Sequence, residues 1–576
     1  MTAHESSVPT FADLPLQRAL HWEKTQPHRV FLTQPMGGGV NRDYTFGQAI
    51  GEARSVAAWL KSEGAKRGWP ERACIAIMSK NCAHWIMCDL AIWMAGYVSV
   101  PLYPTLTAQT VKQILEHSEA KAVFVGKLDD WHQMKAGIPA DTLCFTCSLS
   151  PDDAKHRGWR DWDDIVAKTP PLKDIPNRAE NELATIIYTS GTTGTPKGVM
   201  HTFGTFRAAV DIGTRIWKPT PNGRMLSHLP LSHVAERVGV ETIGLYHGYR
   251  LFFAEAIDTF ARDLRAARPT TFMTVPRLWA KFQQGVFAKM PKQRLDFLFK
   301  LPVIGRAMKK KILAGLGFDA IEIALGGAAP MPPAMLEWYR SLGIELLEAY
   351  GMTENFAVSH CSRPGAVRVG YVGPAQEGVE CKLSDIGEVL VRSPCNMVGY
   401  YKDEEKTREV LSEDGWLKTG DLGELDEQGR LRITGRAKEL FKTSKGKYVA
   451  PAPIENKLSA HPKIEACCVT GVNFAQPFAL VMLAPGAAKD STAREELKSS
   501  LAQHLEEVNA GLDPHEQLDF LAVVPEQWTV ESGFITPTMK IKRNVVEKHY
   551  EPRFEVWQKS KQPVVWADSG ASSSSR

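Results

Sequence analysis

The stretch from Tyr188 to Met200 constrains this chain more than any other. It reads Tyr-Thr-Ser-Gly-Thr-Thr-Gly-Thr-Pro-Lys-Gly-Val-Met and follows Ala184-Thr185-Ile186-Ile187, an apolar, β-branched run that predicts a buried strand. The glycines let the backbone turn and bring its N–H groups close to a ligand. Hydroxyl groups, free amides and the ammonium group of Lys197 together suit a polyanion such as a nucleotide triphosphate.

This stretch differs from the Walker phosphate loop, which needs Gly, four residues, and then Gly-Lys-Ser/Thr. Counted from Gly191, Pro196 stands where the second Gly should be, and Gly198 stands where Ser or Thr should follow the Lys. The alternative is a polar surface loop. Such loops rarely combine this length, a lysine and a preceding strand, so the ligand-binding interpretation is favoured.

The same residues resemble the phosphate loop of the adenylate-forming superfamily, which contains acyl-CoA synthetases, luciferases and the adenylation domains of peptide synthetases. The resemblance implies a phosphate loop over 188–200, a catalytic part for Thr193 and a place on Mg²⁺ for Thr189. The nucleotide contacts that it implies here are Thr189, Ser190, Gly191, Thr192, Thr193 and Lys197.

Length and composition limit the possible classes of protein. A chain of 576 residues is too long for one compact core, so two or more domains are expected. A net charge of +4 is too small to indicate a nucleic-acid partner. The ten cysteines form no regular framework, and Cys144 and Cys147 are interpreted as a chance pair, which favours a reduced, cytoplasmic protein.

The most apolar stretch runs from Trp85 to Pro104, but it contains Asp89 and ends in prolines. A membrane span needs about 20 apolar residues, so a buried helix over 85–95 followed by a strand over 97–102 is expected instead. Peripheral contact with the inner face of a membrane stays open.

Strand and helix patterns alternate through the first half of the chain. Apolar positions spaced three or four apart predict a helix after Thr45, and short β-branched runs predict strands over 73–78 and 122–126. We therefore predict an α/β protein with stacked mixed and parallel sheets and helices in a large domain. The charged, proline-containing region 151–181 is interpreted as surface connections.

Further stretches of interest follow the phosphate loop along the chain. Leu229-Pro230-Leu231-Ser232-His233 precedes the apolar segment 234–249, and the resemblance assigns His233 to the acyl site. A lone histidine is more often structural, and packing explains apolar segments more often than ligand contact does. The strand and small-residue turn at 321–330 leave room for a flat ring beside Gly327 and Ala328.

The segment Tyr350-Gly351-Met352-Thr353-Glu354 places an aromatic ring, a hydroxyl and a carboxylate within five residues. Tyr350 and Gly351 can hold adenine, Thr353 can bind the α-phosphate, and Glu354 can hold Mg²⁺ as a hard oxygen ligand. A strand-to-helix turn with capping residues is the alternative. The resemblance to the superfamily's Tyr-Gly-x-Thr-Glu motif favours the functional interpretation.

The chain then approaches a predicted domain boundary. The resemblance implies that Asp421 binds the ribose hydroxyls, that Arg436 contacts the ribose and phosphate region, and that Lys438 is a hinge residue. It implies a large AMP-binding domain over 1–436 and a small mobile α+β domain over 437–565. The Ser/Gly-rich composition of the end predicts a disordered tail over 566–576. The block from Gly387 to Tyr401 is interpreted as mainly structural, and lysines near 442–447 as candidates for CoA contacts.

The late lysine departs from the superfamily pattern. In Thr536-Pro537-Thr538-Met539-Lys540-Ile541-Lys542, methionine stands where glycine is usual, and a second lysine follows. The alignment favours Lys540 as the catalytic lysine and leaves Lys542 as the alternative. This variant resembles long-chain acyl-CoA synthetases of the bubblegum-like type.

The implied reaction uses ATP and Mg²⁺ to convert a fatty acid, expected to be long-chain, into acyl-AMP, which then reacts with CoA. Two alternatives keep the fold. One is a ligase that passes the acyl group to a carrier protein or closes a β-lactone, and the other is a nucleotide-binding protein without activity. Acyl chain length and oligomeric state stay open.

Overall fold

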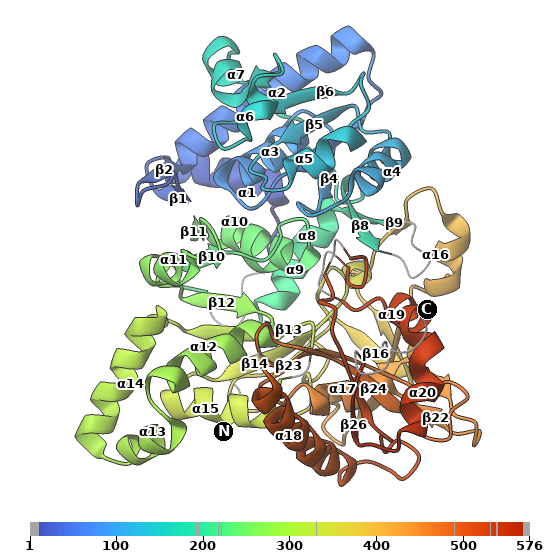
Figure 1. The fold of residues 1–576 in the computed structure, drawn as a ribbon. Coiled ribbons are helices and arrows are strands. Elements are labelled where there is room, and N and C mark those ends of the chain that lie inside the picture. Colours follow the sequence, from blue (N-terminus) through green and yellow to red (C-terminus); the bar gives the residue numbers. More distant parts are fainter. Residues whose placement is uncertain are drawn as a thin grey trace. The chain divides into compact units, whose positions relative to one another are not determined.

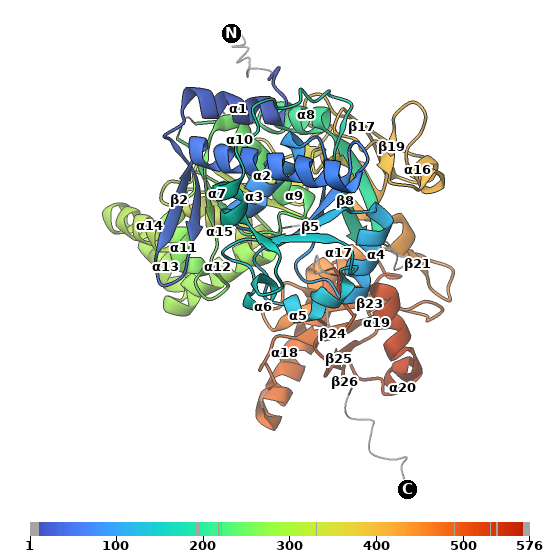
Figure 2. The same cartoon turned by 90° about the horizontal axis from the view of Figure 1, so that it is seen from above.

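The computed structural model divides the chain into two compact units (Figures 1 and 2). Unit 1 contains residues 1–382, 390–418 and 426–431, and unit 2 contains 383–389, 419–425 and 432–576. The predicted boundary after Arg436 and the hinge at Lys438 stay predictions. The residues that the structure describes are 11–190, 196–216, 219–220, 222–329, 331–488, 490–529, 532–536 and 540–567.

The largest sheet of unit 1 has eight strands in the order β18-β9-β8-β4-β3-β5-β6-β7. Six neighbouring strands of this sheet, β8, β4, β3, β5, β6 and β7, are parallel. The strand β9 pairs antiparallel with β8 on one side and with β18 on the other. The predicted α/β class is therefore confirmed. The strands are β3 Cys74–Met78, β4 Val98–Leu102, β5 Ala122–Val125, β6 Leu143–Thr146, β7 Arg160–Asp161, β8 Leu183–Ser190, β9 Pro196–Thr202 and β18 Gly399–Tyr400.

Helices cover this sheet where the apolar spacing predicted them. The helix α2, Phe46–Arg67, begins at Thr45, whose hydroxyl accepts a hydrogen bond from the Gln48 amide. It packs against α1, Pro15–Thr25, and against α3, Ala83–Met94 (Figure 2). Every residue of α3 is buried, which explains its almost continuous apolar sequence. Among the described residues, no helix is long and apolar enough to cross a membrane.

The region 151–181 is not merely a set of surface connections, so that prediction is wrong. It contains α6 Asp152–Lys155, β7 and α7 Trp162–Lys168. Trp162 is fully buried, and its indole N–H donates to Glu52 at 2.9 Å. One large aromatic side chain anchors α7 to α2, although the charged residues around it dominate the composition of the segment.

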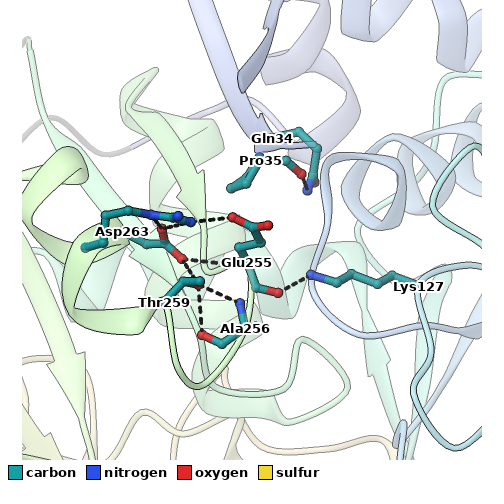
Figure 3. A network of polar contacts seen from close by, with 8 residues as sticks. Gln34, Pro35, Lys127, Glu255, Ala256, Thr259 and Asp263 are labelled. Carbon is teal, nitrogen blue, oxygen red and sulfur yellow. Dashed lines mark hydrogen bonds and ion pairs between the residues drawn. The ribbon is translucent and has the colours of Figure 1, made fainter. Parts of the chain in front are cut away.

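Two further sheets lie wholly in unit 1 and have the orders β10-β11-β1-β2 and β12-β13-β14-β15. Lys127, which follows β5, donates to the carbonyl oxygen of Glu255, which follows β11, at 2.5 Å (Figure 3). This bond joins the first sheet to the second. The strands are β1 Val30–Pro35, β2 Asn41–Thr45, β10 Arg224–Ser227, β11 Arg250–Phe253, β12 Thr271–Thr274, β13 Ile323–Gly327, β14 Leu346–Tyr350 and β15 His360–Cys361.

The network around Glu255 is closed by the N-terminal turn of a helix. The Asp263 carboxylate accepts from the Glu255 amide and from the Thr259 hydroxyl, both at 2.8 Å (Figure 3). The remaining longer helices of unit 1 are α4 Ala108–Ser118, α8 Phe203–Gly213, α11 Phe260–Ala267, α12 Pro276–Lys289, α13 Lys292–Phe299, α14 Pro302–Leu316, α15 Pro333–Leu342 and α16 Glu404–Val410.

A fourth sheet has the order β16-β17-β19-β20. The boundaries between the two units fall within or next to its strands, so each unit contains part of this sheet. Its strands are β16 Glu380–Leu383, β17 Glu388–Arg392, β19 Leu417–Leu425 and β20 Leu431–Arg436. Unit 2 continues with η4 Ala437–Glu439, β21 Phe441–Lys442, β22 Tyr448–Val449 and α17 Pro451–Leu458.

The main sheet of unit 2 has the order β23-β24-β25-β26, and its two faces carry separate apolar cores. Helices and strands both occur here, as the α+β class that the sequence predicted for the small domain requires. Trp566, which was counted with the tail, is the last residue of β26. The elements are β23 Ile464–Thr470, β24 Phe478–Leu483, α18 Ser491–Asn509, β25 Leu521–Val524, α19 Arg543–Tyr550, α20 Phe554–Lys559 and β26 Val564–Trp566.

Candidate active site

The predicted phosphate loop joins two paired strands. Thr189 of β8 pairs with Lys197 of β9, and Ser190 pairs with Pro196 in antiparallel register. The strand that the sequence predicted before the loop is thus present. The tip of the hairpin, with Gly191, Thr192 and Thr193, lies outside the described residues.

Lys197, Tyr400 and Glu354 lie together in unit 1, although they are far apart in the sequence. The Tyr400 hydroxyl donates to a Glu354 carboxylate oxygen at 2.8 Å, and the Lys197 ammonium group lies 5.0 Å from the centre of the Tyr400 ring. Burial raises the pKa of the Tyr400 hydroxyl, so it stays protonated and donates. A small pocket here is lined by His117, Pro196, Lys197, Gly198, Tyr400, Tyr401, Asp403 and Lys406.

The backbone at this place needs small residues and tight turns. A Cβ atom on Gly198 would lie 2.7 Å from the Ile186 side chain, and one on Gly351 would lie 2.4 Å from the backbone of Ala357. Phe356 and Ala357 both have positive φ angles, 49° and 59°. The chain therefore folds back directly after Glu354, and glycine at 351 makes the close approach possible.

The motif from Tyr350 to Glu354 spans the end of β14 and a 3₁₀ turn, η3 Thr353–Asn355. The Thr353 carbonyl accepts from the buried His201 ring at 2.8 Å. Burial lowers the pKa of His201 to about 3, so this ring is neutral. The Tyr350 ring is half-buried and lies 6.0 Å from the His360 ring.

Gly327 is the last residue of the neighbouring strand β13, and Ala328 follows it. Gly327 pairs with Ala349, one residue before Tyr350, so the predicted small-residue turn and the aromatic residue lie on adjacent strands. Ala328 is exposed and has a φ angle of 68°. The buried Glu348 carboxylate accepts from the Met331 amide at 3.1 Å, which ties the chain after this turn to β14. Burial raises the pKa of Glu348 to about 7.

His233 precedes α9, Val234–Glu236, and caps it, because its Nδ1 atom accepts from the Ala235 amide at 3.1 Å. This bond places the proton of the neutral ring on Nε2. The ring is half-buried, with the Tyr103 ring 6.5 Å away. The structure thus gives His233 a local capping bond, and its assignment to the acyl site stays a prediction.

Unit 2 holds the other predicted residues. Asp421 of β19 is buried and accepts from the Arg436 guanidinium group of β20 at 2.9 Å. The Asp421 amide donates to the Thr419 hydroxyl at 3.1 Å, which holds the strand around the carboxylate. Lys438 is exposed in the short turn η4, directly after Arg436.

The two late lysines of unit 2 differ in their surroundings. Lys540 is exposed, and its backbone exchanges hydrogen bonds with Thr536 at 2.8 and 3.1 Å. Lys542 is half-buried at the start of α19, and its carbonyl oxygen accepts from the amides of Val545 and Val546. Residues 537–539 lie outside the described part of the chain. Lys542 thus precedes and caps a helix, whereas Lys540 is bonded to Thr536.

Sequence reasoning missed two features. Tyr400 stood in a block interpreted as structural, yet its hydroxyl contacts Glu354. The apolar segment 234–249 contains Arg237, which is fully buried and paired with Asp89 at 2.5 Å and Glu241 at 3.3 Å. The sequence did carry a signal for this buried ion cluster. Asp89 stands inside an apolar run, and Arg237 and Glu241 are spaced four residues apart.

The chain is similar to known proteins along most of its length. Residues 20–401 match the AMP-binding enzyme family, and residues 439–559 match the C-terminal domain of AMP-binding enzymes. The peroxisomal long chain acyl-CoA synthetase 7 of Arabidopsis thaliana is 30% identical over 88% of this chain and 80% of that protein. Long-chain-fatty-acid–CoA ligase FadD15 of Mycobacterium tuberculosis is 30% identical over 92% of this chain and 95% of that protein.

A solved structure agrees in fold. The adenylation domain of a carboxylate reductase from Mycobacterium chelonae superposes with a TM-score of 0.78 at 22% identity, covering 95% of this chain and 91% of that one. The chain therefore belongs to the AMP-binding enzyme family. Within it, the chain is similar to long-chain acyl-CoA synthetases along nearly its whole length. The bubblegum-like subtype stays a prediction.

Proposed function

We propose that this enzyme activates a long-chain fatty acid with ATP to acyl-AMP and then transfers the acyl group to CoA, releasing AMP and pyrophosphate. The observation that carries the proposal is the cluster of Lys197, Tyr400 and Glu354 where β8 and β9 reach the phosphate loop. It supplies a cation and a held carboxylate beside a loop rich in hydroxyls and amides. The similarity to long-chain acyl-CoA synthetases supports the substrate class.

The chemistry explains why such a cluster is needed. A carboxylate is a poor acyl donor because its oxygen is a bad leaving group. Attack of that oxygen on the α-phosphorus of ATP forms the acyl–O–P bond and breaks the bond to pyrophosphate. Two anions must therefore be brought together, and the charge that develops on the phosphates must be stabilised.

In unit 1, Lys197 and the amides of the phosphate loop would hold the leaving pyrophosphate, with Thr193 at the loop tip and Thr353 at the α-phosphate. Mg²⁺ is bound in phosphate sites by one or two carboxylates together with the phosphates and water. The described residues contain no group of three or more His, Cys, Asp or Glu that could hold a metal alone. A single held carboxylate, Glu354, fits such a shared site, where the ion would neutralise phosphate charge.

In unit 2, the Asp421 carboxylate can accept two hydrogen bonds and would bind both ribose hydroxyls. Arg436, which pairs with it, would contact the ribose and phosphate region. Lys540 would bridge the substrate carboxylate and the α-phosphate. Lys438 would be the hinge at which the small domain turns, so that Lys540 serves the first half-reaction and CoA enters for the second.

Replacing Tyr400 with phenylalanine tests the place of Glu354. The change removes the hydroxyl that fixes the carboxylate and keeps the ring beside Lys197. Loss of a group that orients a metal ligand commonly costs about 10–100-fold in metal affinity, so the Mg²⁺ concentration for half-maximal activity is expected to rise about tenfold. A Mg²⁺ titration of ATP–pyrophosphate exchange measures it. The control is Tyr401→Phe. If the required Mg²⁺ concentration rose equally in both variants, the 2.8 Å bond from Tyr400 to Glu354 would not explain the effect.

The reaction itself is tested by mass spectrometry of the products from ATP, Mg²⁺ and saturated carboxylic acids of increasing length, with and without CoA. The proposal expects acyl-CoA and AMP only when CoA is present, with long chains preferred. Acyl-AMP that accumulates and does not react with CoA would support the adenylation step but exclude CoA as the acceptor. The acceptor would then be a carrier protein or a nucleophile within the substrate.

A further inference from the structure

The helices α13 and α14 form a strongly basic hairpin. The segment 292–316 contains seven lysine and arginine residues and one acidic residue, Asp296, an excess of six positive charges in a chain whose net charge is +4. Asp296 pairs with Lys292 at 2.7 Å on α13. We use the term basic hairpin for residues 292–316.

The inner face of the basic hairpin is packed into unit 1. Leu295 is buried. Phe299, Ile312 and Leu313 pack against the apolar core that contains buried residues of β12, β13 and β14. The start of α14 crosses the end of α13 closely, because a Cβ atom on Gly305 would lie 2.8 Å from the Phe299 carbonyl oxygen. The two helices lie side by side in both views (Figures 1 and 2). The hairpin is therefore held as one element.

Its outer side carries large apolar side chains near the turn. Phe297 is 64% exposed, Val303 is 81% exposed and Ile304 is 51% exposed. Scattered apolar residues on a surface are ordinary, but these three lie within eight positions of each other on both sides of one turn. Burying them in an apolar medium would be favourable.

Basic side chains surround the apolar turn. The exposed ones are Lys292, Arg294, Lys300, Arg306, Lys310 and Lys311. On α14, Val303, Ala307 and Lys310 follow at helical spacing, so apolar and basic groups share one exposed face. Lysine stems can lie along an apolar boundary while their ammonium groups stay in water.

We propose that the turn of the basic hairpin docks on a bilayer that contains anionic phospholipids. Apolar side chains that enter the headgroup boundary, surrounded by cations, are the features of an interfacial binding helix. Each lysine or arginine near an anionic leaflet contributes about 1 kcal/mol, which is roughly fivefold in affinity. A second copy of the same face would be repelled by like charge, and a nucleic acid would leave Phe297 and Val303 without an apolar partner.

The experiment is co-sedimentation of the full chain with vesicles. Vesicles of phosphatidylglycerol and phosphatidylcholine in equal parts should bind the protein, vesicles of phosphatidylcholine alone should bind it weakly, and added salt should release it. Removing three charges by Lys300→Ala, Lys310→Ala and Lys311→Ala together should weaken binding about 100-fold. Replacing Phe297 and Val303 with serine should weaken it about tenfold or more at unchanged charge.

A matched variant removes the same charge elsewhere in unit 1. Lys61, Lys112 and Lys168 are exposed on α2, α4 and α7, and their joint replacement by alanine should leave vesicle binding within about twofold of the unchanged chain. Equal losses in the two triple variants would overturn the proposal, because net charge would then explain binding. Binding to a DNA duplex that competes with vesicles and ignores Phe297→Ser would overturn it in favour of a general polyanion surface.

The proposal does not depend on the enzyme activity, because sedimentation needs no ATP. ATP–pyrophosphate exchange with a soluble short-chain acid should be the same in all of these variants. A failure of exchange would count against the proposed function alone, and a failure of vesicle binding would count against the basic hairpin alone.

Discussion

Replacement of Lys540 by alanine is expected to lower the rate of acyl-adenylate formation by about 10²–10³-fold, since one donor to a developing charge is commonly worth about 3–4 kcal/mol in the transition state. The thiolysis of supplied acyl-AMP by CoA should keep its rate, because no carboxylate has to approach a phosphate in that step. ATP–pyrophosphate exchange measures the first half-reaction, and acyl-CoA release from synthetic acyl-AMP measures the second.

The matched variant is Lys542→Ala, two residues further along the chain. Lys542 precedes α19, and its backbone keeps its bonds to Phe534, Val545 and Val546 whatever its side chain is. We therefore expect a nearly unchanged exchange rate. A loss of exchange in Lys542→Ala with normal exchange in Lys540→Ala would reverse the assignment, and equal losses in both half-reactions would indicate a damaged unit 2.

The strands and motifs could be predicted because local sequence determines them. Four consecutive apolar or β-branched residues before Tyr188 predict a strand, and β8 is there. Thr45 followed by apolar positions three and four apart predicts the start of α2, and Thr45 caps it. Such signals need only the residues within one turn of helix or a few positions of strand.

Contacts between distant segments could not be predicted in the same way. Tyr400 and Glu354 are 46 positions apart, and their hydrogen bond depends on how β18 pairs with β9. Trp162 is buried by α2, more than 100 positions earlier, so the charged residues around it misled the interpretation. Pairing and packing at long range decide these cases, and a single sequence carries no local signal for them.

The buried ion cluster around Arg237 combines one distant partner, Asp89, with one local partner, Glu241. The Arg237 guanidinium group pairs with Asp89 of α3 and with Glu241 one helical turn away, and lies 5.1 Å from the Trp85 ring. Burial raises the pKa of Glu241 well above its ordinary value and also raises that of Asp89, while the positive charge of Arg237 opposes both shifts. Two carboxyl groups in the core thus depend on one cation.

Replacing Arg237 with methionine should therefore destabilise unit 1 strongly. The apolar volume is largely kept, but Asp89 would stay buried without its cation, and breaking a buried pair in this way costs about 3–5 kcal/mol. Urea unfolding of the full chain, followed by tryptophan fluorescence, measures the free energy of unfolding. Arg408→Met, at an exposed position of α16, is the control and should change it by less than about 0.5 kcal/mol.

A triple variant separates charge from packing. Arg237→Met combined with Asp89→Leu and Glu241→Leu removes all three polar groups, and replacement of a whole buried cluster by apolar residues is often neutral or stabilising. We expect the triple variant to be more stable than Arg237→Met alone, because no uncompensated carboxylate is left in the core. If the triple variant lost as much stability as the single one, the contacts of the guanidinium group with Trp85, Trp93 and Phe206 would explain the effect instead of its charge.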